Sequence, residues 1–209
     1  MTTVFNFLLN HLYAALIVFA VSAAAASLFT KSAAWRVAAG IAGVLACLSI
    51  PILGRSLFEW AASAVERPSP PGLLLLVVLA ISATTGRHVE TSAEFRFGTL
   101  MIALAGLVLY PASVGFLDYD TYALGYSGYL LPIAIALILA YAVYRGYLLT
   151  ALALNVAIGL FLASAGLSFN LWDYVMDPVA WIIATGTWIA IAISFLVVRF
   201  NTAKVLARA

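Results

Sequence analysis

The strongest constraint on this chain is a series of apolar runs, each about as long as a membrane is thick. A helix that crosses a membrane needs roughly 20 mostly apolar residues, with a range of about 17–25. Six runs of the sequence meet this requirement or come close to it: residues 8–29, 37–54, 97–116, 129–144, 147–169 and 178–198. A soluble fold could not hide so many apolar side chains, because much of any folded surface faces water. We therefore expect an all-α, polytopic integral membrane helix bundle.

The composition agrees with this class and indicates a single domain. Only 9% of the 209 residues are charged and 66% are hydrophobic, whereas soluble domains carry about 25% charged residues. No polar stretch is long enough for a separate soluble domain, so residues 1–209 are interpreted as one transmembrane domain. The net charge of +2 is too small to indicate a nucleic-acid partner. The single cysteine, Cys47, excludes a disulfide within the chain.

A seventh run, at residues 70–86, leaves the number of spans open. It reads P-P-G-L-L-L-L-V-V-L-A-I-S-A-T-T-G and would extend only about 25 Å as a helix. Pro70 and Pro71 favour a helix start, and Gly86 favours a helix end. The run predicts either a short span or a segment that re-enters the bilayer. The bundle therefore has seven spans or, alternatively, six.

The distribution of basic residues does not choose between these topologies. Cytoplasmic loops carry an excess of Lys and Arg. With seven helices the inner side holds eight basic residues and the outer side holds Arg55 and Arg67; with six helices these two exchange places with Lys31 and Arg36, and the ratio is unchanged. The uncharged N-terminal segment favours seven spans with the N-terminus outside. Both topologies place the C-terminal tail in the cytoplasm and loops 117–128 and 170–177 outside. The alanine-rich build favours a bacterial inner membrane.

Residues 55–67, R-S-L-F-E-W-A-A-S-A-V-E-R, predict a short amphipathic helix in the membrane interface. Arg55, Glu59, Ser63 and Glu66 would share one helical stripe, and apolar side chains would fill the rest of the surface. This pattern is typical of helices that lie flat on a bilayer.

The two outer loops carry the candidate contact residues. One holds Asp118 and Asp120 among several tyrosines, including Tyr122, and the other holds Trp172, Asp173 and Tyr174. Acidic and aromatic residues are common at outer interfaces, but they also suit a docking surface for a partner. A third interpretation is a divalent cation bound by Asp118, Asp120 and Asp173, because calcium takes six to eight oxygen ligands.

Three further residues bear on the chemistry of the chain. Asp177 followed by Pro178 is typical of a helix start, with the Asp as N-cap and the Pro at the first helical position. Asn155 is an amide within a predicted span. We expect it to pair with another helix, or to contact a substrate. No Asp, Glu, Lys or Arg lies deep within a span, which disfavours an ion-coupled pump.

These observations favour a non-enzymatic subunit or scaffold of a membrane assembly. Its partners would be the lipid bilayer and either another membrane protein or further copies of the chain. One alternative is a small transport or substrate-capture protein with an outward-opening cavity near Asn155. Another is a metal-dependent enzyme at the outer surface. No cofactor is predicted, and a divalent cation at the outer loops is the one exception considered.

Overall fold

The computed structural model describes residues 2–64, 68–116, 118–163 and 168–206 of the chain, and most of these residues are helical. The elements follow in the order α1 (Thr2–Ser27), α2 (Ala33–Ser49), β1 (Pro51–Ile52), β2 (Arg55–Ser56), α3 (Leu57–Ala64), α4 (Pro70–Thr85), α5 (Ser92–Ser113), the 3-10 helix η1 (Tyr122–Gly125), α6 (Leu130–Arg145), α7 (Leu148–Leu162), α8 (Trp172–Val175) and α9 (Pro178–Leu206). The prediction of an all-α fold is confirmed, apart from one two-residue β-hairpin.

Within the described residues, three helices are long and apolar enough to cross a membrane: Phe7–Ser27, Ser92–Ser113 and Pro178–Arg199. Four shorter apolar helices accompany them: Ala33–Ser49, Pro70–Thr85, Leu130–Arg145 and Leu148–Leu162. All seven correspond to the apolar runs of the sequence, and their lengths are compatible with a membrane protein. The shorter four fall at or below the lower limit of about 17 residues for a spanning helix.

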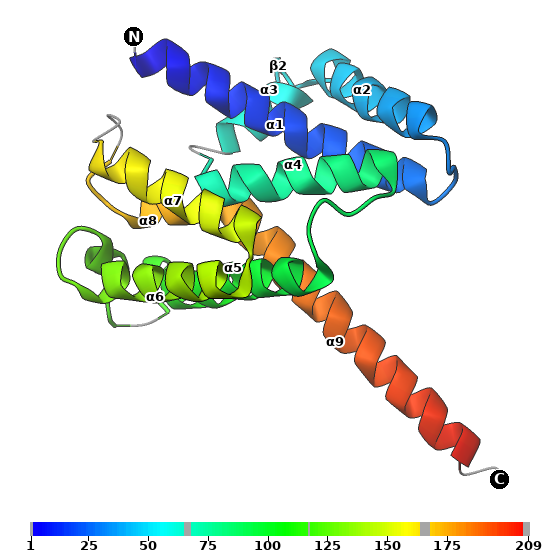
Figure 1. Cartoon of the computed structure of the whole chain (residues 1–209). Helices are drawn as coiled ribbons and strands as arrows, with labels where there is room; N and C mark the ends of the chain where they lie inside the picture. Colours follow the sequence, from blue (N-terminus) through cyan, green and yellow to red (C-terminus); the bar gives the residue numbers. More distant parts are fainter. Residues whose placement is uncertain (1, 65–67, 117, 164–167, 207–209) are drawn as a thin grey trace.

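Helix α4 joins two opposite ends of the bundle (Figure 1). At its start, Ser69 donates a hydrogen bond to Asp177, which begins α9. At its end, the Arg36 guanidinium of α2 donates to the Ala83 carbonyl oxygen at 3.3 Å. We call these the Asp177 end and the Arg36 end. Helix α1 also ends near Arg36, which donates to the Thr30 carbonyl oxygen just after α1. Helices α1 and α4 therefore run in the same direction.

Side-chain caps explain where several helices begin. Ser69 Oγ accepts a hydrogen bond from Gly72 N at 3.1 Å at the start of α4, and Gly86 ends that helix with a left-handed φ of 70°. Both boundaries agree with the expected helix over 70–86. Thr91 Oγ1 accepts from Glu94 N at 3.1 Å, so α5 starts at Ser92, five residues before the predicted 97. Hydroxyl caps of this kind satisfy N–H groups that have no partner inside the helix.

The expected interfacial helix over 55–67 is corrected in its first residues. Arg55 belongs to a hairpin, whose turn places Leu53 and Gly54 at φ 50° and 80°. The helix then begins at Leu57, because Ser56 and Glu59 form a reciprocal cap: Ser56 N donates to Glu59 Oε2 at 2.8 Å and Glu59 N donates to Ser56 Oγ at 3.2 Å. This is the capping box of Ser and Glu three residues apart. Residues 65–67 of the expected helix lie outside the described residues.

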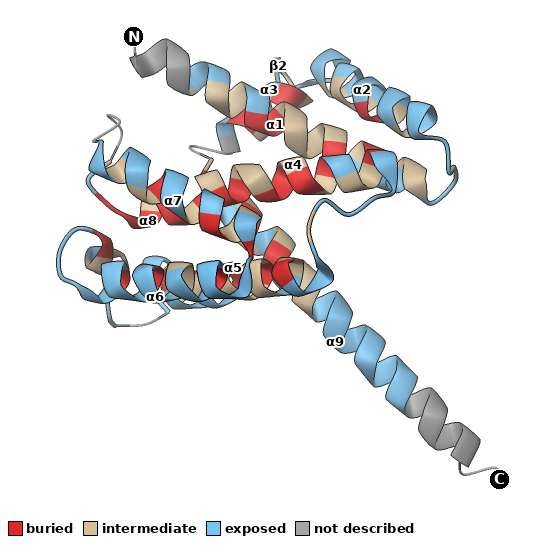
Figure 2. Ribbon diagram, in the orientation of Figure 1, coloured by how far each residue is buried: buried red, intermediate tan, exposed pale blue. Residues whose placement is uncertain are grey.

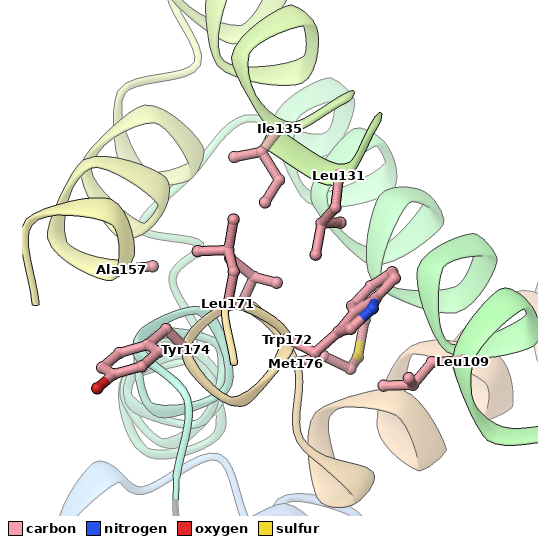
Figure 3. Packing of buried hydrophobic residues seen from close by; sticks show 9 residues of the cluster. Leu109, Leu131, Ile135, Ala157, Leu171, Trp172, Tyr174 and Met176 are labelled. Carbon is pink, nitrogen blue, oxygen red and sulfur yellow. The ribbon is translucent and has the colours of Figure 1, made fainter. Parts of the chain in front are cut away.

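The buried core gathers between α5, α6, α7 and the segment around α8. Figure 3 shows this packing, in which side chains from the four elements point toward one another. The cluster consists of Leu109, Leu131, Ile135, Ala157, Leu171, Trp172, Tyr174, Val175 and Met176. Burial is also concentrated along α4, whereas residues 189–199 of α9 are exposed (Figure 2). Among the α9 residues whose burial is described, the fully buried ones, Ala180 and Ala184, lie near its start.

Helices α5 and α9 approach closely at Gly106, against which the Trp181 indole lies. Gly106→Ala would place a methyl group inside the space of that ring, and overpacking of this kind costs about 1–3 kcal/mol. We expect a lower midpoint of thermal unfolding, followed by circular dichroism in detergent. Gly159→Ala is the matched control, because nothing lies within 4 Å of the added methyl; equal midpoints for the two variants would contradict this packing.

Candidate functional site

A buried carboxylate, Asp177, ties together helices from both ends of the sequence. Its side chain is 1% exposed. Oδ1 accepts hydrogen bonds from the Tyr13 hydroxyl at 2.9 Å and from Ala180 N at 2.8 Å. Oδ2 accepts from Ser69 Oγ at 2.6 Å and from Ser69 N at 3.1 Å. We call Asp177, Tyr13 and Ser69 the Asp177 hub; it joins α1, the start of α4 and the start of α9.

The hub suits a negative charge although it is buried. Asp177 is the acceptor in all four hydrogen bonds, and hydrogen bonds to a charged group are stronger than neutral ones. It also lies at the N-termini of two helices, α4 and α9, whose dipoles favour an anion there. Gly72 has no room for a side chain, because a Cβ would overlap Asp177 Oδ2. The expected N-cap role of Asp177 is observed, but it is only one of the four contacts.

The two outer loops of the sequence analysis lie against each other. Leu171 N donates to the Gly125 carbonyl oxygen at 2.9 Å. The Trp172 indole N–H donates to the Thr121 carbonyl oxygen at 3.0 Å. Asn170, which is fully buried, donates from Nδ2 to the Tyr122 carbonyl oxygen at 3.0 Å and accepts from Trp172 N at 2.9 Å. The segment from residue 170 to 177 is therefore docked onto η1 through its backbone as well as its side chains.

Asp173 and Tyr122 form a pair across this contact. The Tyr122 hydroxyl donates to Asp173 Oδ1 at 2.8 Å, and both residues are half-buried. Burial and the hydrogen bond to Asp173 both raise the pKa of the Tyr122 phenol, so the phenol remains a hydrogen-bond donor at neutral pH. The pairing gives Asp173 a partner within the chain.

Asp118 and Asp120, the other acidic candidates, are both exposed. Asp120 Oδ1 accepts hydrogen bonds from Tyr122 N at 2.9 Å and from Ala123 N at 3.2 Å, and so caps η1. Over the described residues, no three His, Cys, Asp or Glu side chains come together in a group that could hold a metal ion. The described residues thus do not gather Asp118, Asp120 and Asp173 into one group; Asp120 accepts from the backbone at the start of η1, and Asp173 accepts from the Tyr122 hydroxyl.

Two remaining candidates have structural partners. Tyr174 is 6% exposed, donates from its hydroxyl to the Ser168 carbonyl oxygen at 3.0 Å, and packs edge-on against Phe161. Asn155 is exposed and donates from Nδ2 to the Ala151 carbonyl oxygen at 2.8 Å, within α7 itself. Among the described residues the expected pairing of Asn155 with another helix is not seen: its Nδ2 donates instead to a carbonyl oxygen one turn earlier in the same helix.

A cavity of about 390 Å³ lies between α4, α5, α6 and α7. Its wall at the Asp177 end includes Trp172, Val175 and Met176 of the docked segment. Along its length the lining is mainly aliphatic, from residues such as Leu75, Ile102, Ile135 and Leu154. Of the contact candidates Asp118, Asp120, Tyr122, Asn155, Trp172, Asp173 and Tyr174, Trp172 is thus the one among the described lining residues of this cavity.

The other end of the cavity carries two carboxylates, Glu90 and Glu94. Glu94 is 6% exposed, and its Oε1 accepts hydrogen bonds from Leu149 N at 2.7 Å and Thr150 N at 3.0 Å. It therefore caps α7 from the first turn of α5. Glu90 is half-buried, and burial, with the nearby charge of Glu94, raises its pKa to about 7. The cavity is apolar with one acidic end.

The sequence alone did not predict a role for Glu90, Glu94, Ser69 or Tyr13. A signal existed for Glu94, because Thr91 and Glu94 have the spacing of a capping box. Ser69 likewise precedes two prolines, as an N-cap residue would. Nothing local marks Tyr13 or Glu90, whose roles depend on contacts with distant segments.

Comparisons with protein-family models, with curated proteins and with solved structures find no match to this chain. The proposals below therefore depend on the geometry of the described residues.

Replacement of Asp177 by Asn is expected to destabilise the fold. One carboxylate oxygen of Asp177 would be replaced by an NH₂ group, which cannot accept the hydrogen bonds that this oxygen now accepts. Each buried polar group left unsatisfied costs about 1–3 kcal/mol. We expect a clearly lower midpoint of thermal unfolding in detergent for Asp177→Asn. The exposed Asp118→Asn is the control and is expected to unfold within about 0.5 kcal/mol of the unchanged protein. A neutral effect of Asp177→Asn would show that the hub contributes little.

The raised pKa of Glu90 makes a pH-dependent contribution to stability. A carboxyl group with a folded pKa of about 7 binds its proton more tightly in the folded protein than in the unfolded chain. Its contribution is therefore full at a pH below the unfolded pKa of about 4.3 and is lost as the pH rises through 7. The midpoint of thermal unfolding should fall less steeply with rising pH, between pH 4 and 8, for Glu90→Gln than for the unchanged protein. Parallel curves would refute this assignment.

Proposed function

We propose that this chain is a multi-pass protein of the bacterial inner membrane that binds an elongated apolar molecule in the cavity between α4, α5, α6 and α7. The observation that carries the proposal is the cavity itself, with its volume of about 390 Å³ and its mainly aliphatic lining. Small-molecule sites typically have volumes of about 300–1,000 Å³ and are lined mostly by apolar side chains. The proposal corresponds to a capture or transport role.

The topology that fits this proposal has seven spans, with the N-terminus outside and the C-terminus in the cytoplasm. The contact between Arg36 and Ala83 supports it, because this contact brings the α1–α2 loop and the α4–α5 loop to the same end. A six-span topology would require those two loops on opposite sides. In the seven-span topology the Arg36 end faces the cytoplasm and the Asp177 end faces the outside. Helix α4, with 16 residues, extends about 24 Å and needs local thinning of the bilayer or shielding by its neighbours.

The cavity is accessible from the side of the bundle. Leu104 and Leu130 belong to its lining and are 47% and 65% exposed. Apolar side chains exposed on a membrane helix face lipid, so an apolar ligand could enter from the bilayer without crossing water. Asn155, by contrast, is absent from the lining residues, and this proposal gives it no part in binding.

A partner-binding subunit is the second candidate, supported by three exposed tyrosines of the loop around η1. Tyr119, Tyr126 and Tyr129 are 61%, 59% and 82% exposed, and exposed aromatic residues are favoured anchors at interfaces. Trp172 and Tyr174 do not support this role, because both are buried. Replacement of the three tyrosines by Ser would abolish cross-linking to a membrane partner in this case, and would leave the cavity unchanged.

The main proposal is tested by filling the cavity. Ala134 lies in its lining, and Ala136, two residues further along α6, lies outside it; both residues are exposed. Native mass spectrometry of the full chain in an uncharged detergent, with added dodecanol, measures bound ligand directly. Ala134→Phe is expected to lower the occupancy at least about tenfold, equivalent to about 1.4 kcal/mol, and Ala136→Phe to leave it unchanged. Equal occupancy of both variants and the unchanged protein would overturn the proposal.

A further inference from the structure

The charged side chains of the cavity all have the same sign. Among the described residues that line it, Glu90 and Glu94 carry a formal charge, and no Lys, Arg or His is present. Both belong to the end near the α4–α5 loop, because Glu90 lies just before α5 and Glu94 in its first turn. A ligand in this cavity would therefore meet negative charge at one end and aliphatic side chains over the rest of its length.

The two carboxylates differ in the interactions that the protein offers to their negative charge. Glu94 Oε1 accepts two backbone N–H groups at the start of α7, where the helix dipole also favours an anion. For Glu90, in contrast, the effects that alter its titration are burial and the like charge of Glu94. Both effects disfavour its ionised form. Glu90 is therefore the group that gains most from a cation placed inside the cavity.

The shape of the cavity indicates what the apolar part of the ligand would be. Its lining follows one face of α5 from Glu94 through Gly98, Ile102 and Ala105 to Val108. The fourteen helical steps from Glu94 to Val108 extend about 21 Å, and Trp172 and Met176 of the docked segment line the far end. This elongated apolar space suits a single extended hydrocarbon chain better than a compact ring system.

Resting on the function proposed above, we propose that the ligand is a cationic amphiphile with one long hydrocarbon chain, such as a long-chain amine. Its ammonium group lies at Glu90, and its chain extends along α5 toward Trp172. Ammonium donates charge-assisted hydrogen bonds to carboxylate, and its charge also relieves the repulsion between Glu90 and Glu94. An anionic head would add a third negative charge at the same end, and a neutral hydroxyl head would leave that repulsion in place.

The inference is tested with three probes that share one chain and differ in the head: dodecylamine, dodecanol and dodecanoic acid. Occupancy of the full chain is measured by native mass spectrometry in an uncharged detergent at pH 8, where Glu90 is ionised. Dodecylamine is expected to bind at least about tenfold more tightly than the other two, which corresponds to about 1.4 kcal/mol. Glu90→Gln should reduce this preference to less than about threefold and still bind dodecanol, which shows that the cavity is intact.

The matched control is Glu59→Gln, which removes the same charge from an exposed residue of α3 outside the cavity and should keep the full preference for the amine. Equal binding of the three probes, or an amine preference that survives in Glu90→Gln, would overturn the inference about the head group while the cavity proposal stands. If Ala134→Phe fails to displace any of the probes, the proposed function itself is wrong.

Discussion

The burial of one ionisable carboxylate is the constraint on which the rest of the fold depends. Taking a carboxylate out of water is costly unless hydrogen bonds replace its solvation. Asp177 meets this requirement with four donors drawn from three helices. The requirement fixes α1, α4 and α9 relative to one another at the Asp177 end, because none of them can shift without leaving a donor or the carboxylate unsatisfied. Packing of apolar side chains is far less directional, so this hub supplies the specificity that apolar helices lack.

The cavity follows from the same arrangement. Asp177 ends the docked segment of residues 170–177, so the hub also holds Trp172 and Met176 in place as the end wall of the cavity. At the Arg36 end, Glu94 performs a comparable task by capping α7 from α5. Two carboxylates thus anchor the helices at opposite ends, and between them the walls are mainly aliphatic. Among the described residues that line the cavity, Glu90 is a carboxyl group whose ionised form is disfavoured by burial and by the charge of Glu94.

Local signals in the sequence were sufficient for the helices and several of their ends. The start of α4 at Pro70, its end at Gly86 and the N-cap at Asp177 all follow from residue preferences that act over a few positions. The direction in which Trp172 and Tyr174 point could not be predicted in this way. Aromatic residues in an outer loop suit both an exposed contact and a buried one, and the choice is made by docking onto η1, a segment about 50 residues away in the sequence. Asn155 is a different case: a local acceptor, the Ala151 carbonyl oxygen one turn earlier in α7, competes with the partner on another helix that an amide within a span was expected to have.

The separation of the hub residues along the chain has a consequence for assembly in the membrane. Tyr13 and Asp177 are 164 residues apart. The Tyr13 hydroxyl therefore cannot donate to Asp177 until nearly the whole chain has been synthesised. Contacts between distant residues form late, because the intervening loop must first be closed. In the proposed seven-span topology α9 is the last helix to enter the bilayer. Before it does so, Ser69 and Tyr13 have no carboxylate to bind, and α1 and α4 would be held mainly by nonpolar packing. Insertion of α9 would then complete the hub, and a chain that ends before Asp177 would lack it.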